Sequence, residues 1–304
     1  MPKFRFFAKH LGFLLFRRLA ALVCLSLILS GCRRSAPGGA ENPTLARGET
    51  LWATANGWRL KTVVYRSVSV GSNPVLVLVL PGDAAFGPTS AQYDFAARAA
   101  ARLDNVVVAG ILRPGFPDGT GDRSEGPRGF GNGDNYTPQI VDAIAGVAEQ
   151  LKTKFHPAGV ILVGHSGGAV IAADIAGRWP STVNAGLLVS CPCDLPAWRK
   201  HMRGVKNSSL WKRWAGIVAW RLPVGSLSPM EVVSRVPSST LVTMVVGSAD
   251  PIAPPRFSEE YAAKLREHGV PVSVVIAPRL PHLILFEPVV FEQLQNLVTR
   301  LRAR

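Results

Sequence analysis

The sequence has few residues of the kinds that bind metal ions. It contains four cysteines and six histidines among 304 residues, and no cluster of histidine, cysteine and aspartate has the spacing of a metal site. Cys24 and Cys32 lie near the N-terminus, and the other two cysteines form the pattern Cys191-Pro192-Cys193. The sequence therefore predicts no metal site.

Internal repeats, low-complexity blocks and long hydrophobic runs are also missing from the sequence. The apolar run at residues 19–29 is too short to span a bilayer comfortably. Basic residues precede it, as in the first part of a signal peptide: Lys3, Arg5, Lys9, Arg17 and Arg18. We therefore interpret residues 1–31 as a signal peptide that the mature chain has lost.

The four residues Leu29-Ser30-Gly31-Cys32, which follow this run, resemble the bacterial lipobox. That resemblance implies export, cleavage before Cys32 and a lipid anchor on Cys32. Arg33, and not aspartate, follows the cysteine, which favours the outer membrane if the source is Gram-negative. An ordinary secretory signal, or an uncleaved helix, is the alternative.

Acidic residues are scarce: 20 Asp and Glu stand against 34 Lys and Arg, for a formal net charge of +14. Five basic residues leave with the signal peptide, which lowers this charge to +9. No nucleic-acid-binding module accounts for the charge, and a lipid-anchored basic protein would be attracted to anionic headgroups. Residues 32–48, which contain Pro37, Gly38, Gly39 and Pro43, are expected to form a flexible tether.

Export would place Cys191 and Cys193 in an oxidising compartment, where a disulfide is permitted. A bond between cysteines separated by one residue closes a tight ring. Two free, packed thiols are the alternative.

The remaining residues, 49–304, alternate between strand and helix patterns. Asn56-Gly57 is a hairpin turn signal, and residues 75–80 are apolar throughout, as in a strand covered on both faces. Further strands are expected at 106–112, 160–163, 185–190, 240–246 and 270–276, with helices at 90–103, 137–154, 167–179, 257–268 and 288–304. Ser90 is the expected cap of the first helix. This order predicts an α/β fold with a doubly wound, mostly parallel sheet.

Two segments interrupt the alternation. Residues 113–137 contain seven glycines, and a loop this long is usually functional or mobile. Residues 195–236 form an insert with Trp198, Trp211, Trp214 and Trp220 among lysines and arginines. We interpret the insert as a helical cap whose aromatic residues line a pocket; a membrane-facing surface, or tryptophans that simply belong to the core, are the alternatives.

Ser166 lies where a strand pattern turns into a helix pattern. Residues 160–163 are apolar and mostly β-branched, and Gly164-His165-Ser166-Gly167-Gly168 follows them. In a G-x-S-x-G turn the glycines leave room for a strained backbone with the serine at its tip. The amide of Gly167 can donate to an oxyanion. Ser166 is therefore the candidate nucleophile, although glycine and serine are common in ordinary turns.

A serine hydroxyl needs a base to take its proton and a carboxylate to orient that base. Asp250 follows the strand pattern at 240–246, and His282 follows that at 270–276. Because the carboxyl ends of parallel strands meet at one edge of a sheet, we expect both residues near Ser166. The chain order Ser, Asp, His is that of the α/β-hydrolase triad.

On these motifs, residues 49–304 resemble an α/β-hydrolase. The resemblance implies that Ser166 is the nucleophile, that His282 acts as general base and then general acid, and that Asp250 is the orienting carboxylate.

The resemblance also implies an oxyanion hole with one amide from Gly167 and another from the loop after residues 75–80. That loop begins Pro81-Gly82 where the family usually has His-Gly, so Asp83 or Ala84 is the candidate for the second amide. A carboxylate beside an oxyanion is unfavourable unless it points away or pairs with Arg113.

Other polar residues near these motifs have simpler interpretations. His165 is expected to pack and hydrogen-bond, and Asp174 is expected to be structural. Asp194 is an alternative triad acid in a poorer context than Asp250. Arg113 and Arg128 either bind an anionic substrate group or are solvated loop charges.

The sequence therefore predicts a lipid-anchored serine hydrolase that cleaves small-molecule carboxylic esters through an acyl-enzyme intermediate, without a cofactor. The membrane is an expected partner through the anchor, and nucleic acid is not. A peptidase, lipase or thioesterase uses the same triad, and a non-catalytic envelope binding protein with this fold is the alternative of another class.

Overall fold

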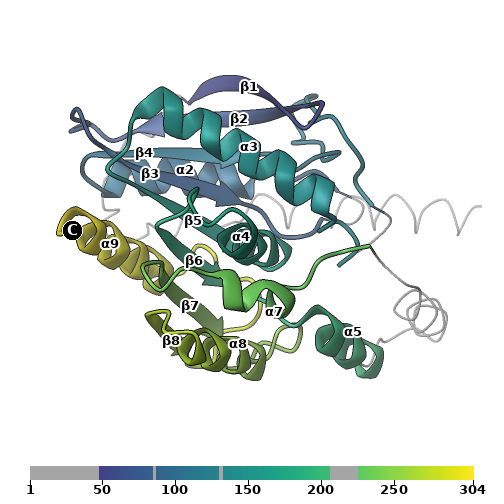
Figure 1. Cartoon of the computed structure of the whole chain (residues 1–304). Coiled ribbons are helices and arrows are strands. Elements are labelled where there is room, and N and C mark those ends of the chain that lie inside the picture. The colour runs from purple at the N-terminus through teal and green to yellow at the C-terminus, as the bar shows by residue number, and fades with distance from the viewer. Residues whose placement is uncertain (1–47, 85–86, 130–132, 206–224) are drawn as a thin grey trace, which may run out of the picture. The chain divides into compact units, whose positions relative to one another are not determined.

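The computed structural model describes residues 48–84, 87–129, 133–205 and 225–304. These residues form an eight-stranded sheet with helices on both faces (Figure 1). The predictions for the signal peptide, for Cys32 and for the tether up to residue 47 lie outside the described residues. Among the helices of the described ranges, none is both long and apolar enough to cross a bilayer.

The strands lie in the order β1-β2-β4-β3-β5-β6-β7-β8. Every neighbouring pair from β4 to β8 is parallel, whereas β2 runs antiparallel to both β1 and β4. The predicted mostly parallel sheet is confirmed. The bounds are β1 Glu49–Ala55, β2 Trp58–Arg66, β3 Val75–Leu80, β4 Val106–Ile111, β5 Gly159–His165, β6 Ala185–Val189, β7 Leu241–Gly247 and β8 Val272–Ala277.

The predicted hairpin at Asn56-Gly57 joins β1 to β2. Both turn residues have positive φ, 50° and 79°, which is the conformation that a two-residue type I′ turn requires. Glycine adopts it without a steric penalty and asparagine tolerates it.

Helices cover the sheet in two groups. The first face packs against α3 (Pro138–Phe155), α4 (Gly167–Arg178) and α8 (Pro255–Glu267), and the second against α2 (Ala91–Arg102) and α9 (Pro288–Arg302). Shorter elements are α5 (Leu195–Gly204), α7 (Pro229–Val232) and the 3-10 helix η1 (Val233–Arg235). The alternation of strands and helices in the sequence thus produces three layers.

The central strand β3 shows why its sequence is apolar at every position. Its leucines, Leu76, Leu78 and Leu80, belong to the core on the α3/α4/α8 face, and its valines, Val75, Val77 and Val79, to the core on the α2/α9 face. All six side chains are fully buried. Burial on both faces removes the usual polar alternation of a strand.

Ser90 occupies the N-cap position of α2, as predicted, but its side chain makes no capping hydrogen bond. Its backbone, with φ −125° and ψ −2°, lies outside the extended region that N-cap residues typically adopt. The predicted capping by this hydroxyl is therefore wrong, although the helix begins where it was expected.

Within the segment at 195–236, the described residues include the helices α5, α7 and η1, whereas residues 225–228 are not helical. Trp198 is buried in the core, and its Nε1 donates to the carbonyl oxygen of Ile252 at 2.9 Å. For this tryptophan the core interpretation is confirmed. Trp211, Trp214 and Trp220 lie outside the described residues, so the cap stays a prediction.

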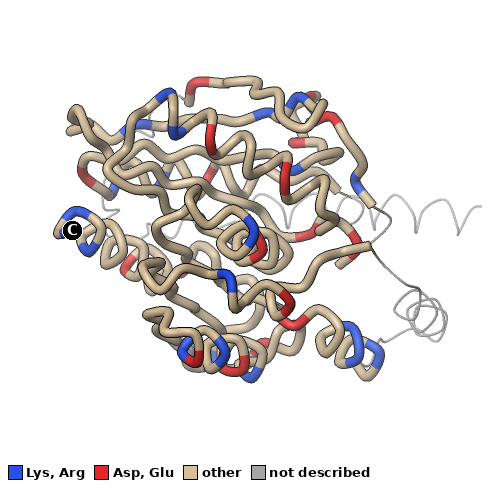
Figure 2. Tube along the Cα trace, viewed as in Figure 1, with Lys and Arg blue, Asp and Glu red and all other residues tan. Residues whose placement is uncertain are grey.

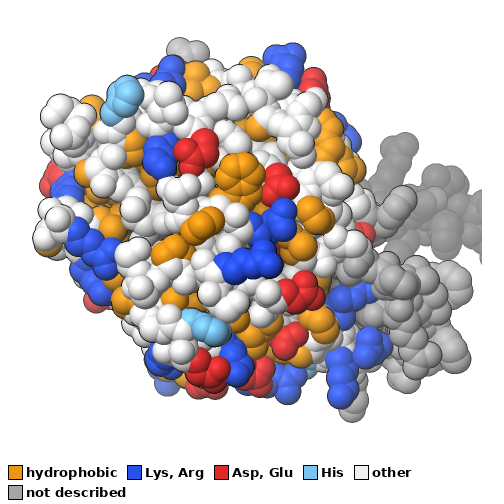
Figure 3. Space-filling model, in the orientation of Figure 1, with side chains coloured by type: hydrophobic (Ala, Val, Ile, Leu, Met, Phe, Trp, Pro, Cys, Tyr) orange, Lys and Arg blue, Asp and Glu red, His pale blue; other side chains and the backbone are white. Residues whose placement is uncertain are grey.

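Charged residues of both signs are spread over the described elements (Figure 2). The face seen in Figure 3 carries apolar side chains scattered between polar and charged ones. Such scattering is normal for a protein surface.

Candidate active site

Ser166 lies between the end of β5 and the start of α4, with φ 52° and ψ −119°. A positive φ is strained for a residue with a Cβ atom. Backbone hydrogen bonds hold this conformation: the Ser166 amide donates to Val189 O at 2.8 Å, and the amides of Ala169 and Val170 donate to Ser166 O. The predicted strand, sharp turn and helix are confirmed.

The glycines of the motif are required by close backbone approach. A Cβ on Gly164 would lie 2.5 Å from the backbone nitrogen of Ala169, and one on Gly168 would lie 2.5 Å from the carbonyl oxygens of Leu80 and Pro81. Both distances are far shorter than van der Waals contact. Glycine at 164 therefore lets β5 pack against the start of α4, and glycine at 168 lets the turn pack against the end of β3.

The structure brings the three predicted triad residues into one chain of hydrogen bonds. Nε2 of His282 lies 2.9 Å from Oγ of Ser166, and Nδ1 of His282 lies 2.8 Å from Oδ2 of Asp250. An ionised carboxylate can only accept, so Nδ1 donates to Asp250 and Nε2 is left to accept the serine proton. This is the tautomer that a general base needs.

Asp250 is held in its charged form. Burial alone would raise the pKa of its carboxyl, but the hydrogen bond from His282 and the amides of Ala253 and Ile252 hold that pKa below its usual range. The two amides donate to Oδ1, at 2.9 and 2.8 Å, while Oδ2 faces the imidazole. The turn after β7 thus fixes the carboxylate that orients His282.

Gly167 is the first residue of α4, so its amide is among those without an acceptor inside the helix. A Cβ placed on Gly167 would lie 2.5 Å from the hydroxyl oxygen of Tyr136 and would also contact the carboxylate of Asp83. Asp83 and Tyr136 therefore lie directly beside the predicted oxyanion amide.

Three hydrogen-bond donors bind the carboxylate of Asp83. Nη1 of Arg113 donates to Oδ1 at 2.7 Å, and Oδ2 accepts from the hydroxyl of Tyr136 at 2.6 Å and from the amide of Gly133 at 2.9 Å. The ion pair neutralises a charge that would oppose an oxyanion. The expected condition, that this side chain pairs with Arg113, is met.

The two arginines of the loop at 113–137 do not match the alternative prediction of solvated loop charges. Arg113 is fully buried and also donates to Oδ1 of Asn135 at 3.0 Å. Arg128 is half-buried and donates to the carbonyl oxygens of Ala84 and Gly87. Neither guanidinium is a solvated loop charge, because each binds acceptors of the loop that follows β3.

His165 and Asp194 both have structural partners. Nε2 of His165 hydrogen-bonds to the backbone carbonyl of His282 at 3.0 Å, which confirms its predicted packing role. Asp194 caps α5 by accepting from the amide of Ala197 at 3.0 Å, while His282 pairs with Asp250. The alternative of Asp194 as triad acid is therefore wrong.

Asp174 is completely buried in α4, and neither of its carboxylate oxygens has a hydrogen-bond partner among the described residues. Burial raises the pKa of this carboxyl well above its usual range, and Glu231 raises that pKa further, against the effect of Arg178.

Among the residues that the structure describes, no group of three or more histidine, cysteine or acidic residues could hold a metal ion.

Sequence reasoning missed two polar residues of the site, Tyr136 and Ser190. Tyr136 bonds to Asp83, and Oγ of Ser190 donates to the carbonyl of His282 at 3.0 Å. Ser190 directly follows β6, and a position at the carboxyl end of a parallel strand was the available signal. Tyr136 lies in a loop, where no periodic pattern marks it.

Comparison with known proteins identifies the fold. A family model described as the alpha/beta hydrolase fold matches residues 136–286. No curated protein sequence matches the chain.

Solved structures with this fold cover most of the chain at low sequence identity. Est1E from Butyrivibrio proteoclasticus, with ferulic acid bound, is 14% identical with a TM-score of 0.62 over 84% of this chain and 100% of its own. An esterase from Pyrobaculum calidifontis is 17% identical with a TM-score of 0.61 over 86% of both chains. A puromycin-hydrolyzing peptidase from Mycobacterium tuberculosis is 16% identical with a TM-score of 0.63 over 86% of this chain. The chain spans only 40% of that peptidase.

Together with the strand order, these matches show that the chain has the α/β-hydrolase fold.

Proposed function

We propose that this protein with an α/β-hydrolase fold is a serine hydrolase that cleaves carboxylic esters through an acyl-enzyme intermediate. The observation that carries the proposal is the continuous hydrogen-bond chain from Ser166 through His282 to Asp250. Each bond lies within the range expected between a nucleophile, its base and the group that orients the base.

In the first half of the reaction, Oγ of Ser166 attacks the ester carbonyl carbon while its proton passes to Nε2 of His282. Asp250 stabilises the resulting imidazolium through the bond at Nδ1. His282 then gives the proton to the leaving alcohol oxygen, and the acyl group stays on Ser166. In the second half, water attacks the acyl carbon, His282 takes a proton from the water, and that proton returns to Oγ when the acid leaves.

The oxyanion that forms in both halves would accept from the Gly167 amide and from the amide of Asp83 or Ala84. Three observations support this placement: Gly167 begins α4, Asp83 lies beside it, and Arg113 neutralises the Asp83 carboxylate. The proposed hole needs no metal ion, because backbone amides stabilise the charge.

Labelling with a fluorophosphonate tests the nucleophile. Phosphonates react with activated serines, so we expect the wild-type protein to be labelled and the Ser166→Ala variant to lose both label and esterase activity, the latter by at least about a thousandfold. Ser181→Ala, which removes an exposed hydroxyl, is the matched control and should label normally. Label that survives in Ser166→Ala would contradict the proposal.

Substrate class is tested with a panel. Short-chain and long-chain nitrophenyl esters, a thioester and an aminoacyl anilide share a chromogenic readout and differ in the acyl and leaving groups. We expect the oxygen esters to give the highest kcat/KM. A preference for the aminoacyl anilide would instead support the peptidase alternative. This substrate is included because the chain is structurally similar to a puromycin-hydrolyzing peptidase.

A further inference from the structure

The loop that carries His282 must travel a long way to reach Ser166. His282 follows β8 at the edge of the sheet, whereas Ser166 follows β5, and β6 and β7 lie between these strands. The loop therefore crosses the carboxyl ends of two strands before it delivers the imidazole. A catalytic base on such a span needs support along the way, because reacting groups must be held to a fraction of an ångström.

The first support is at the end of β7. The amide of Arg279 donates to Oγ of Ser248 at 2.8 Å, and the amide of Ala249 donates to Leu280 O at 3.0 Å. A Cβ on Gly247 would collide with the carbonyl oxygen of Leu280, so the loop lies directly on the strand end. The Gly247 position also lies against the carbonyl oxygen of Pro281, so these contacts end one residue before His282.

The second support is on His282 itself, at its backbone carbonyl oxygen. Oγ of Ser190 and Nε2 of His165 both lie 3.0 Å from this oxygen. A carbonyl oxygen can only accept, so the hydroxyl and the ring nitrogen both donate to it. The amide of Ile284, two residues further along the same loop, also donates to this oxygen, at 3.1 Å. The two donors come from the ends of β6 and β5, which are the last two strands under the loop.

Both donors are fixed in place. His165 is the last residue of β5 and precedes the nucleophile. Ser190 is fully buried with φ 50°, and its amide donates to Val245 O at 2.8 Å. The two side chains therefore link the His282 backbone directly to the ends of β5 and β6.

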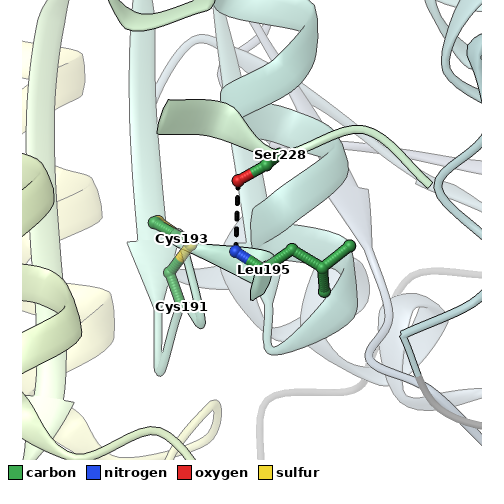
Figure 4. Close-up of a disulfide and its surroundings, with 4 residues drawn as sticks. All are labelled: Cys191, Cys193, Leu195 and Ser228. Carbon is green, nitrogen blue, oxygen red and sulfur yellow. Dashed lines mark hydrogen bonds between the residues drawn. A yellow bond between two sulfur atoms is a disulfide. The ribbon is translucent and has the colours of Figure 1, made fainter. Parts of the chain in front are cut away.

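The chain after Ser190 is also constrained. Cys191 and Cys193 form a disulfide, and both are fully buried. Figure 4 shows the disulfide next to Leu195, whose amide donates to Oγ of Ser228 at 3.1 Å. This arrangement constrains the backbone that follows Ser190.

We infer that Ser190 and His165 are positioning residues, which hold the His282 imidazole between Asp250 and Ser166 through its backbone carbonyl. The inference rests on the proposed function. It assigns the two residues no contact with substrate, so their loss should slow the chemical step and leave substrate binding almost unchanged.

The first test compares Ser190→Ala with the wild type in the full-length protein. We expect Ser190→Ala to lower kcat for a nitrophenyl ester by about tenfold to a hundredfold, with KM changed by less than about twofold. The rate of fluorophosphonate labelling should fall by the same factor.

His165 provides an independent second variant. His165→Ala removes the ring donor and should also lower kcat, whereas His165→Gln places an amide nitrogen near the position of Nε2 and should recover part of it. In the double variant Ser190→Ala/His165→Ala, the carbonyl loses both side-chain donors and keeps the amide of Ile284. We expect the fall in kcat to differ from the product of the single effects, because the two groups act on one atom.

A structural control separates positioning from loss of folding. Thr243→Val removes a buried hydroxyl that lies 3.2 Å from Oγ of Ser273, between β7 and β8, and touches no part of the His282 loop. It should lower the unfolding midpoint and leave kcat per folded molecule at the wild-type value. Active-site titration gives the folded, reactive fraction for each variant.

Two results would overturn the inference. One is a Ser190→Ala enzyme with wild-type kcat and labelling rate; the other is a fall in kcat in His165→Ala that His165→Gln does not recover at all. Either result, in a protein whose activity is lost in Ser166→Ala, leaves the proposed function intact. Activity that persists in Ser166→Ala would instead contradict the proposed function, and the inference that rests on it would also be lost.

Discussion

At the scale of single residues, burial acts in opposite directions on His165 and Asp174. Both side chains are almost completely excluded from water, and burial disfavours the charged form of either group. A buried histidine therefore loses its proton more readily, and a buried carboxyl holds its proton more tightly. The two residues should give opposite pH dependences of stability.

Burial lowers the pKa of His165 to about 4, with a further lowering by His282 that hydrogen bonding to the His282 carbonyl and the charges of Asp250 and Asp83 partly offset. Between the ordinary histidine pKa near 6.5 and about 4, the unfolded chain binds a proton that the native protein does not. The free energy of unfolding should therefore fall as the pH is lowered through this window, by about 3 kcal/mol in all.

Denaturant unfolding of the wild type and of His165→Gln at several pH values from about 7 to about 4 measures this effect. The variant lacks the titrating group. The difference in free energy of unfolding between the wild type and the variant, in favour of the wild type at neutral pH, should therefore decrease as the pH falls. A difference between the two proteins that is constant with pH would contradict the assignment.

Asp174→Asn should show the reverse trend. Because burial raises the pKa of Asp174, the native state keeps a proton that the unfolded chain releases above its ordinary pKa near 3.8. The stability that this group contributes is complete below that value and is lost as the pH rises, with a slope of up to about 1.4 kcal/mol per pH unit. Denaturant unfolding should show that the free energy of unfolding of Asp174→Asn, relative to that of the wild type, increases from acid to neutral pH. Parallel curves would rule out a titrating Asp174.

At the scale of elements, the loop at 113–137 is held to the sheet by buried and half-buried ion pairs. Arg113 pairs with Asp83 after β3, and Lys61 of β2 pairs with Asp118 at 2.5 Å and Asp122 at 2.7 Å. These pairs join the loop at 113–137 to β2 and to the loop after β3 that carries the proposed second oxyanion amide. The loop thus supports the site from the side opposite the His282 loop.

Arg113→Ala should be strongly destabilising. The substitution leaves the carboxylate of Asp83 buried without its counter-charge, and breaking a buried pair in this way costs about 3–5 kcal/mol. Denaturant unfolding measures the loss. Arg123→Ala, an exposed arginine of the same loop, is the matched control and should change stability by less than about 0.5 kcal/mol. Equal effects of the two variants would contradict a structural role for Arg113.

The sequence was sufficient for the strands, the helices and the relation of Ser166, Asp250 and His282, because each follows a periodic strand pattern and parallel strands share one carboxyl edge. It was insufficient for Arg113, which looked like a loop charge. Its burial depends on Asp83, Asn135 and two aromatic rings that only the folded chain assembles around it. Ser190 escaped notice for the same reason, since its partner is a backbone oxygen 92 residues away.

At the scale of the whole molecule, the sequence predicts attachment to a membrane, and two physical mechanisms could provide it. Basic residues exceed acidic ones by 14, so electrostatic attraction to anionic headgroups is one candidate, and an acyl anchor on Cys32 is the other. The two differ in salt dependence, because salt screens exposed charges and leaves the burial of acyl chains almost unaffected.

Membrane fractionation of the full-length chain expressed in a bacterial host distinguishes them. We expect the wild type to remain with membranes after a wash in about 0.5 M NaCl, where the Debye length is only a few ångströms, and to enter the detergent phase on phase separation. Cys32→Ser should leave the detergent phase because it lacks the acylated residue. Cys24→Ser, a change inside the predicted signal peptide, is the matched control and should behave as the wild type does. Release of the wild type by salt would favour attachment by charge, and retention of Cys32→Ser in the detergent phase would favour an uncleaved N-terminal helix.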